Sequence, residues 1–291
     1  MTSHISISSN PIQRPELRIA LLKPHAHSII FWKLLAKNSS KYGRSVNVWI
    51  ANSFSDTEFR HQHPDIIVFS DCSGCAKIPF TRSEIKTILN YVQFGHNKHI
   101  LATYAAFYYA ENERIFDNTL LCQLFNLKPV DDMILSPKRT EEEEEYKSIP
   151  LLFPHVDRYW DGVIFPFKSS GYYQYVYPPH ELWENYLIEP DKTKIILSDS
   201  DMHYVAMLTQ HSNYASLYFN FMIDWGIGEH EEDIYIMYKA LMILELCSTQ
   251  STLFSMCCDV IYKNPEYYAP KILPTDICYS LDKGLEYHGV K

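Results

Sequence analysis

Two short clusters in the sequence combine side chains that bind metals, act as bases or serve as nucleophiles. Cys72-Ser-Gly-Cys75 follows an apolar stretch, Asp65–Phe69, and His25-Ala-His27 follows another, Arg18–Leu22. Thiolates and imidazoles are ligands that Zn²⁺ prefers. A thiolate is also a nucleophile when an adjacent base removes its proton. These residue types allow three kinds of chemistry, namely metal binding, thiol redox and nucleophilic catalysis.

Each kind of chemistry makes a different demand on the two clusters. A metal site would use both histidines and both cysteines, His25, His27, Cys72 and Cys75, on adjacent loops. A redox CxxC usually opens a helix, whereas a proline lies just beyond this one. In the enzyme interpretation, Cys72 is a displaced nucleophile, His25 or His27 is its base, and Asp71 orients that base. The residues leave these alternatives open.

Alternating strand and helix patterns are expected to position the clusters. Apolar runs predict four strands, and between them the pattern predicts helices over Ser28–Ala36 and from Thr81 to Gly95. Thr81 and Glu84 have capping-box spacing, and Gly95 stands where a helix C-terminus is expected. The alternation predicts an α/β protein with a mostly parallel, flavodoxin-like sheet in a three-layer α/β/α arrangement. The four strands are Arg18–Leu22, Val46–Ala51, Asp65–Phe69 and His99–Thr103.

The predicted strand order brings the two clusters together. In a flavodoxin-like order, 2-1-3-4-5, the first and third strands are neighbours. Their C-terminal loops, which carry His25–His27 and Asp71–Cys75, then flank the crevice in which open α/β sheets bind ligands. Helices that begin at this edge direct their N-terminal dipoles into it and favour anionic or polar ligands. We expect the crevice to be the functional surface.

The rest of the chain divides into an arm, a domain and an extension. Residues 1–16 are expected to form a flexible N-terminal arm, residues 17–247 the α/β domain, and residues 248–291 a C-terminal extension with two helical turns at most. An acidic loop insertion at 131–150 contains Glu141–Glu145. The later part of the domain is expected to contain two helices, Asp117–Leu127 and Ile234–Leu244. It is also expected to contain five strands: Gly162–Phe167, Gln174–Tyr177, Lys194–Ser198, Tyr204–Gln210 and Ala215–Phe221. A hairpin turn that carries a solvated His211 is expected to join the last two strands.

Composition and charge narrow the class of partner. The formal net charge of −9 disfavours binding to nucleic acid or to anionic membranes. No stretch approaches the roughly 18 apolar residues that cross a bilayer, and the N-terminus lacks the apolar core of a secretory signal. The seven cysteines are then expected to be reduced thiols in the cytoplasm, or also in the nucleus. The usual nucleotide-binding, zinc-protease and serine-hydrolase motifs do not occur, so no cofactor is expected.

Two further motifs bear on function. Ala102-Thr103-Tyr104-Ala105-Ala106 follows the fourth strand, and Tyr218-Phe219-Asn220-Phe221-Met222 lies on a late strand. With the order of elements over residues 17–247, they resemble the class I glutamine amidotransferase-like superfamily, which includes the amidotransferases, the DJ-1/PfpI proteins, the ThuA-like proteins and the N-terminal domain of some biotin protein ligases. In that superfamily the strand ends in a sharp turn of the form small-x-nucleophile-small-small, and a histidine lies on the late strand.

The resemblance implies that the catalytic residues of the superfamily are missing. Ala102, Ala105 and Ala106 keep the small positions, but Tyr104 replaces the nucleophilic cysteine and Asn220 replaces the histidine. Neither a thiolate nor a base remains. The leading hypothesis is a degenerate amidotransferase-like protein that binds an unknown small polar ligand or a protein partner, with Tyr104 at the same crevice. The rival is a hydrolase or ThuA-like enzyme that uses His25, His27 and Cys72.

Overall fold

The computed structural model describes residues 16–70, 80–94, 98–104, 106, 119–128, 151–156, 159–169, 186–200, 202, 204–225 and 231–263, the last sixteen of these as backbone alone. Within these ranges the chain is a mixed α/β protein built on one nine-stranded sheet, whose order is β2-β1-β3-β4-β9-β8-β7-β5-β6. The strands are β1 (Leu17–Leu22), β2 (Val46–Ala51), β3 (Ile66–Ser70), β4 (His99–Thr103), β5 (Leu151–Pro154), β6 (Phe167–Lys168), β7 (Thr193–Asp199), β8 (Tyr204–Gln210) and β9 (Ala215–Phe219).

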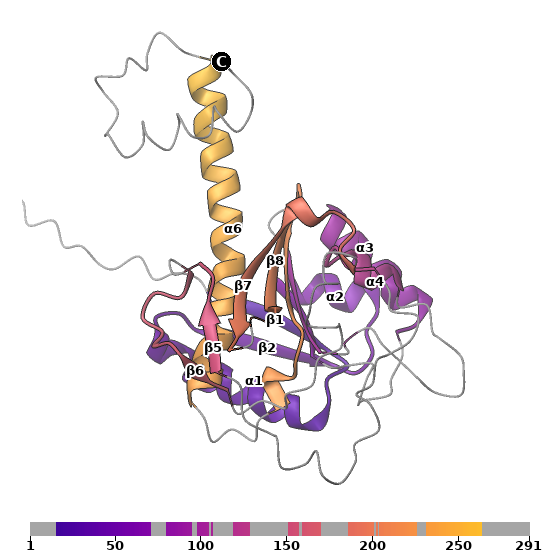
Figure 1. The fold of residues 1–291 in the computed structure, drawn as a ribbon. Coiled ribbons are helices and arrows are strands. Elements are labelled where there is room, and N and C mark those ends of the chain that lie inside the picture. The colour runs from indigo at the N-terminus through magenta and orange to yellow at the C-terminus, as the bar shows by residue number, and fades with distance from the viewer. Residues whose placement is uncertain are drawn as a thin grey trace, which may run out of the picture. The chain divides into compact units, whose positions relative to one another are not determined.

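The sheet has a parallel part and an antiparallel part that share β9. Strands β2, β1, β3, β4 and β9 pair in parallel, with β1 next to β3 as the sequence predicts. Beyond β9 the strands run antiparallel, and Figure 1 shows β7 and β8 side by side with β5 beyond β7. The hairpin between β8 and β9 closes with a hydrogen bond from His211 N to the Tyr214 carbonyl, as expected.

Five helices lie between and after the strands in this part of the chain: α1 (Ala26–Asn38), α2 (Asp56–Gln62), α3 (Arg82–Phe94), α4 (Thr119–Gln123) and α6 (Glu231–Lys263). The start of α3 confirms the predicted capping box. Thr81 N donates to the Glu84 carboxylate at 2.8 Å, and Glu84 N donates to Thr81 Oγ1 at 3.2 Å. These bonds pair two amide groups that the first turn of a helix otherwise leaves unsatisfied.

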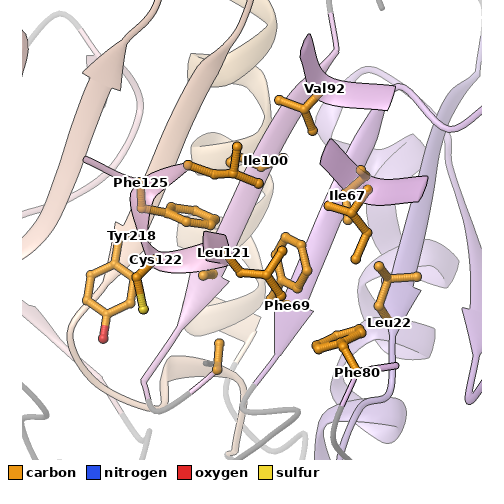
Figure 2. Close-up of a cluster of buried hydrophobic side chains, with 14 of the residues drawn as sticks. Leu22, Ile67, Phe69, Phe80, Val92, Ile100, Leu121, Cys122, Phe125 and Tyr218 are labelled. Atoms are coloured by element: carbon orange, nitrogen blue, oxygen red, sulfur yellow. The ribbon is translucent and has the colours of Figure 1, made fainter. Parts of the chain in front are cut away.

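Alternate residues of the parallel strands form one side of the hydrophobic core. Leu22, Ile67, Phe69 and Ile100 pack with apolar side chains of α3, of α4 and of the turn after α4, including Val92, Leu121, Cys122 and Phe125 (Figure 2). Leu21, Val68 and Leu101, which alternate with them, are equally buried. Because successive side chains of a strand point to opposite faces, these residues cover the other face of the sheet. Burial on both faces explains the nearly unbroken apolar sequence of β3.

Several predictions about the later part of the chain are wrong. Residues 162–167 form turns and irregular structure, and only Phe167 begins a strand. The last helix continues through Lys263, so the C-terminal extension begins with far more than two helical turns. In the helix predicted over 117–127, residues 117 and 118 lie outside the described part, Thr119–Gln123 is helical, and the chain leaves the helix after Gln123. The sequence patterns do not predict α2, β5 or β6. The predicted strand at 174–177 and the acidic loop lie outside the described residues.

The chain divides into two compact units, Met1–Leu244 and Glu245–Lys291. Of the described helices, none combines the length and the apolar composition needed to cross a membrane.

Candidate functional site

The histidine cluster lies at the C-terminal end of β1, where α1 begins. His25 is the N-cap residue of α1, and its Nδ1 accepts a hydrogen bond from His27 N at 3.4 Å. The two imidazole rings are stacked with centroids 5.1 Å apart. Burial, with a smaller contribution from His27, lowers the pKa of His25. His25 is therefore biased toward its neutral form, and capping occupies the nitrogen atom Nδ1.

The cysteine cluster predicted to face these histidines is not described. Asp71, Cys72 and Cys75 all lie outside the described residues, so the distance from His25 or His27 to Cys72 stays open. Among the residues that the structure does describe, no group of three or more His, Cys, Asp or Glu side chains is placed to hold a metal ion. The metal, redox and nucleophile interpretations of Cys72 and Cys75 stay predictions.

Tyr104 sits in a left-handed turn directly after β4. Its φ of 48° is unusual for a bulky residue, because such residues rarely adopt positive φ angles. Two hydrogen bonds from β9 hold this turn: Tyr104 N donates to the Phe219 carbonyl at 2.8 Å, and the Tyr218 hydroxyl donates to the Tyr104 carbonyl at 2.6 Å. The Tyr104 side chain is 6% exposed and belongs to the core cluster of Phe69 and Tyr218.

Asn220 occupies the corresponding place at the end of the neighbouring strand. Thr103 and Phe219 are register partners of β4 and β9, so Tyr104 and Asn220 each follow one member of a paired position. Asn220 is fully buried, and its backbone N–H donates to the Val205 carbonyl at 2.8 Å. The two residues that the resemblance selected therefore lie at the ends of adjacent parallel strands, although 116 positions separate them in sequence.

A buried ion pair lies at the same edge, after β1. Lys23 has a φ of 46°, and its ammonium group lies 3.1 Å from the Glu84 carboxylate and 5.5 Å from the centre of the Phe80 ring. Both side chains of the ion pair are about 5% exposed or less. Backbone strain and buried charge are often found together at functional sites. The capping-box spacing identifies Glu84 only as a helix cap, and no sequence pattern singles out Lys23.

A second buried polar group was also missed. Asp224, in the short 3₁₀ helix η5 (Ile223–Trp225) after β9, accepts hydrogen bonds from the Ser70 hydroxyl and from Trp32 Nε1. Thr103 is the register partner of Ser70 on the adjacent strand. The available sequence signal was weak: an aspartate within the apolar run Phe219 to Trp225, and a hydroxyl residue at the end of β3 and of β4.

The remaining histidine of interest, His211, is less exposed than predicted. It lies in the β8–β9 hairpin as expected, but its ring stacks on Tyr214 with centroids 4.1 Å apart and its Nε2 lies 3.3 Å from Ser216 Oγ. Burial lowers the pKa of His211 to about 4. The side chain is a packed, neutral histidine of the hairpin rather than a solvated one.

Comparison with known proteins finds similarity in structure but not in sequence. No model of a protein family and no curated protein sequence matches the chain. Similar solved structures include the exo-β-1,4-mannosidase Op5Man5 from Opitutaceae bacterium strain TAV5 (TM-score 0.41, 11% identity, covering 78% of this chain and 35% of the mannosidase). They also include the cytoplasmic protein STM1381 from Salmonella typhimurium LT2 (0.43, 10%, 80% of this chain and 99% of that one). A ThuA-like protein from Parabacteroides merdae ATCC 43184 is a third (0.40, 12%, 81% of this chain and 91% of that one).

Proposed function

We propose that the chain is a catalytically degenerate glutamine amidotransferase-like protein that acts as a ligand-binding or protein-interaction module. One observation carries the proposal: the left-handed turn after β4 holds Tyr104, whose side chain is buried in the core. A catalytic turn of this kind needs a nucleophile that faces the substrate. A buried phenol that contributes to the packing of the core provides no such nucleophile.

The residue beside Tyr104 supports the same conclusion. Cysteine amidotransfer requires a histidine that takes the proton of the thiol. Asn220, at the end of the adjacent strand β9, is fully buried, and its side-chain amide cannot act as a base near neutral pH. Both catalytic positions of the superfamily therefore hold residues that are suited to packing and hydrogen bonding.

The proposal takes the domain to have the three-layer, flavodoxin-like arrangement. The order of the parallel strands, β2-β1-β3-β4-β9, supports this arrangement, since it corresponds to the 2-1-3-4-5 order with β9 in the last place. In such sheets ligands bind at the C-terminal ends of the strands. Lys23, His25 and Tyr104 lie at those ends, which makes this edge the proposed binding surface.

A second candidate function is a hydrolase or ThuA-like enzyme that uses Cys72 with His25 or His27. The lowered pKa of His25 favours this candidate, because a base must be unprotonated to accept a proton. Nδ1 of His25 caps α1, so Nε2 is the nitrogen that would have to accept the proton. Replacing Cys72 with Ser distinguishes the two candidates, because any hydrolytic activity of this kind must disappear.

The proposal is tested by rebuilding the missing nucleophile. Tyr104→Cys is expected to release no ammonia from glutamine above background, because Asn220 cannot serve as the base. The paired substitution His25→Ala with Cys72→Ala tests the binding surface and is compared with wild type for thermal stability and cellular phenotype. If stability and every phenotype match wild type while a patch elsewhere proves essential, the edge is not the functional surface.

A further inference from the structure

A single buried carboxyl group joins four segments of the domain. Asp224 Oδ2 accepts a hydrogen bond from the hydroxyl of Ser70, the last residue of β3, and another from Trp32 Nε1 of α1 at 2.9 Å. The hydroxyl of Thr103, the last residue of β4, lies close enough to act on the same carboxyl group without completing a hydrogen bond to it. Helix α1, strands β3 and β4, and η5 therefore meet at one side chain, beside the turn that holds Tyr104.

Two oxygen atoms of this network are unpaired. Within the part of the chain that the structure describes, neither Asp224 Oδ1 nor Thr103 Oγ1 has a hydrogen-bond partner, and both residues are 1% exposed or less. A buried polar atom without a partner costs about 1–3 kcal/mol. A proton on Asp224 Oδ1 would let the carboxyl group donate to Thr103 Oγ1, so that one hydrogen bond would pair both atoms.

The surroundings of Asp224 favour the protonated form. Burial raises the pKa of Asp224 by more than Ser70, Trp32, Thr103 and the backbone N–H of Asp224 together lower it. A buried carboxylate is normally paired with a cation, but among the described residues only hydroxyl, indole and backbone groups act on this one. The titratable side chains on the adjoining elements are His25, His27, Lys33 and Lys37 on or beside α1, His99 on β4, and Tyr218 on β9. None of them is among the groups that principally shift the pKa of Asp224.

We propose that Asp224 is a neutral carboxylic acid at neutral pH and acts as a proton-dependent clamp on this edge of the sheet. When Oδ1 loses its proton, Thr103 must change from acceptor to donor, and a charge enters a buried site in which the described residues provide no counter-ion. Thr103 directly precedes Tyr104, so losing the hydrogen bond between Asp224 and Thr103 also destabilises the left-handed turn at Tyr104. The clamp does not depend on what the edge binds.

The clamp is tested by Asp224→Asn, which keeps the shape of the side chain and places an amide donor where the carboxyl proton would be. Urea denaturation of both proteins is compared from pH 4 to pH 9, with the exposed Asp191→Asn as a control. A raised folded-state pKa stabilises the wild type at low pH, and this advantage is lost as pH rises toward the folded pKa. The ratio of the wild-type unfolding constant to that of the variant is therefore expected to rise by up to about tenfold per pH unit. A ratio that stays constant, or that falls as pH rises, would overturn the proposal.

Two measurements on the wild type decide the question even if the variant does not fold. Infrared spectra at pH 7 are expected to show a protonated carboxyl group after the exposed carboxyl groups have ionised, and the lack of that absorption contradicts the clamp. A cation bound to an ionised Asp224 is the competing explanation. It predicts that Na⁺ or K⁺ stabilises the protein more than choline does at equal ionic strength. Such selective stabilisation would overturn the proposal that Asp224 is neutral, whereas equal stability in the three salts supports it.

Discussion

The Tyr218 hydroxyl donates a hydrogen bond to the Tyr104 carbonyl at 2.6 Å. The bond connects β9 to the left-handed turn after β4, and both residues are at most 6% exposed. A positive φ at a residue with a large side chain persists only when the surrounding structure enforces it. Tyr218 is one of the groups that enforce it here, together with the Phe219 carbonyl, which accepts from Tyr104 N.

Removing the Tyr218 hydroxyl is expected to destabilise the protein. Tyr218→Phe leaves the Tyr104 carbonyl without this buried donor and is expected to lower the free energy of unfolding by about 1–3 kcal/mol. Urea denaturation measures the change. Tyr42→Phe is the control, because the contacts of Tyr42 with Tyr235 and Tyr238 are made by its ring. Equal effects of the two substitutions would show that the hydrogen bond to Tyr104 contributes nothing.

The buried ion pair is expected to be more sensitive to losing one partner than to losing both. Lys23→Met leaves the Glu84 carboxylate buried without its cation, which is expected to cost about 3–5 kcal/mol of unfolding free energy. Adding Glu84→Gln removes that charge and keeps an acceptor for the Thr81 amide, so the double variant is expected to be more stable than Lys23→Met alone.

The exposed ion pair of Asp56 and Arg60 on α2 provides a control for this experiment. Its side chains are 48% and 69% exposed, so Arg60→Met is expected to cost less than about 1 kcal/mol. If Lys23→Met costs no more than Arg60→Met, or if the double variant is less stable than Lys23→Met, the buried pair does not have the role assigned to it.

The contribution of His99 to stability is expected to fall as pH drops below the usual pKa of histidine. Burial lowers the pKa of His99 to about 4. Its Nδ1 accepts a hydrogen bond from Ala215 N, which requires that nitrogen to be unprotonated. The unfolded state, with a pKa near 6.5, binds more protons between these values. The contribution of His99 is therefore complete above about pH 6.5 and is lost toward pH 4, by up to roughly 3 kcal/mol.

Denaturation as a function of pH checks this prediction. His99→Asn keeps an acceptor near the Ala215 amide, and the stability of the wild type relative to this variant is expected to fall between pH 6.5 and pH 4. His61→Asn, on an exposed part of α2, is expected to leave the pH dependence unchanged. If the unfolding free energy of His99→Asn changes with pH as that of the wild type does, the pH dependence comes from other groups. The half-buried His211 is the first of these to examine.

The parts of the fold that the sequence predicted best are those with local signals. Strands β2 and β4 match their predicted limits because each is a short apolar run between polar residues, and α3 begins at a capping box that is visible in four residues. Strands β5 and β6 have four and two residues, and β5 alternates exposed and half-buried or buried positions. The pairing of β5 with β7 and with β6 depends on contacts that no local pattern reveals.

In the candidate site, too, the sequence identifies the residues that have a local signal and not those that only strand pairing brings together. Tyr104 and Asn220 were found because small or aromatic neighbours surround them at a spacing that is visible within each segment. Asp224 and Ser70 are 154 positions apart, and each is an ordinary residue in its own segment. Only the pairing of β3 with β4 and of β4 with β9 brings Ser70, Thr103 and Asp224 to one place, so sequence patterns alone could not identify the network.

Ammonia release from glutamine by the purified wild-type protein tests the central claim most directly. With Tyr104 in the core and Asn220 in place of the base, the rate is expected to equal that of a buffer blank, and Tyr104→Cys is expected to give the same result. Glutamine-dependent ammonia release above background by the wild type, lost on replacing Cys72 with Ser, would contradict the claim and establish a displaced nucleophile.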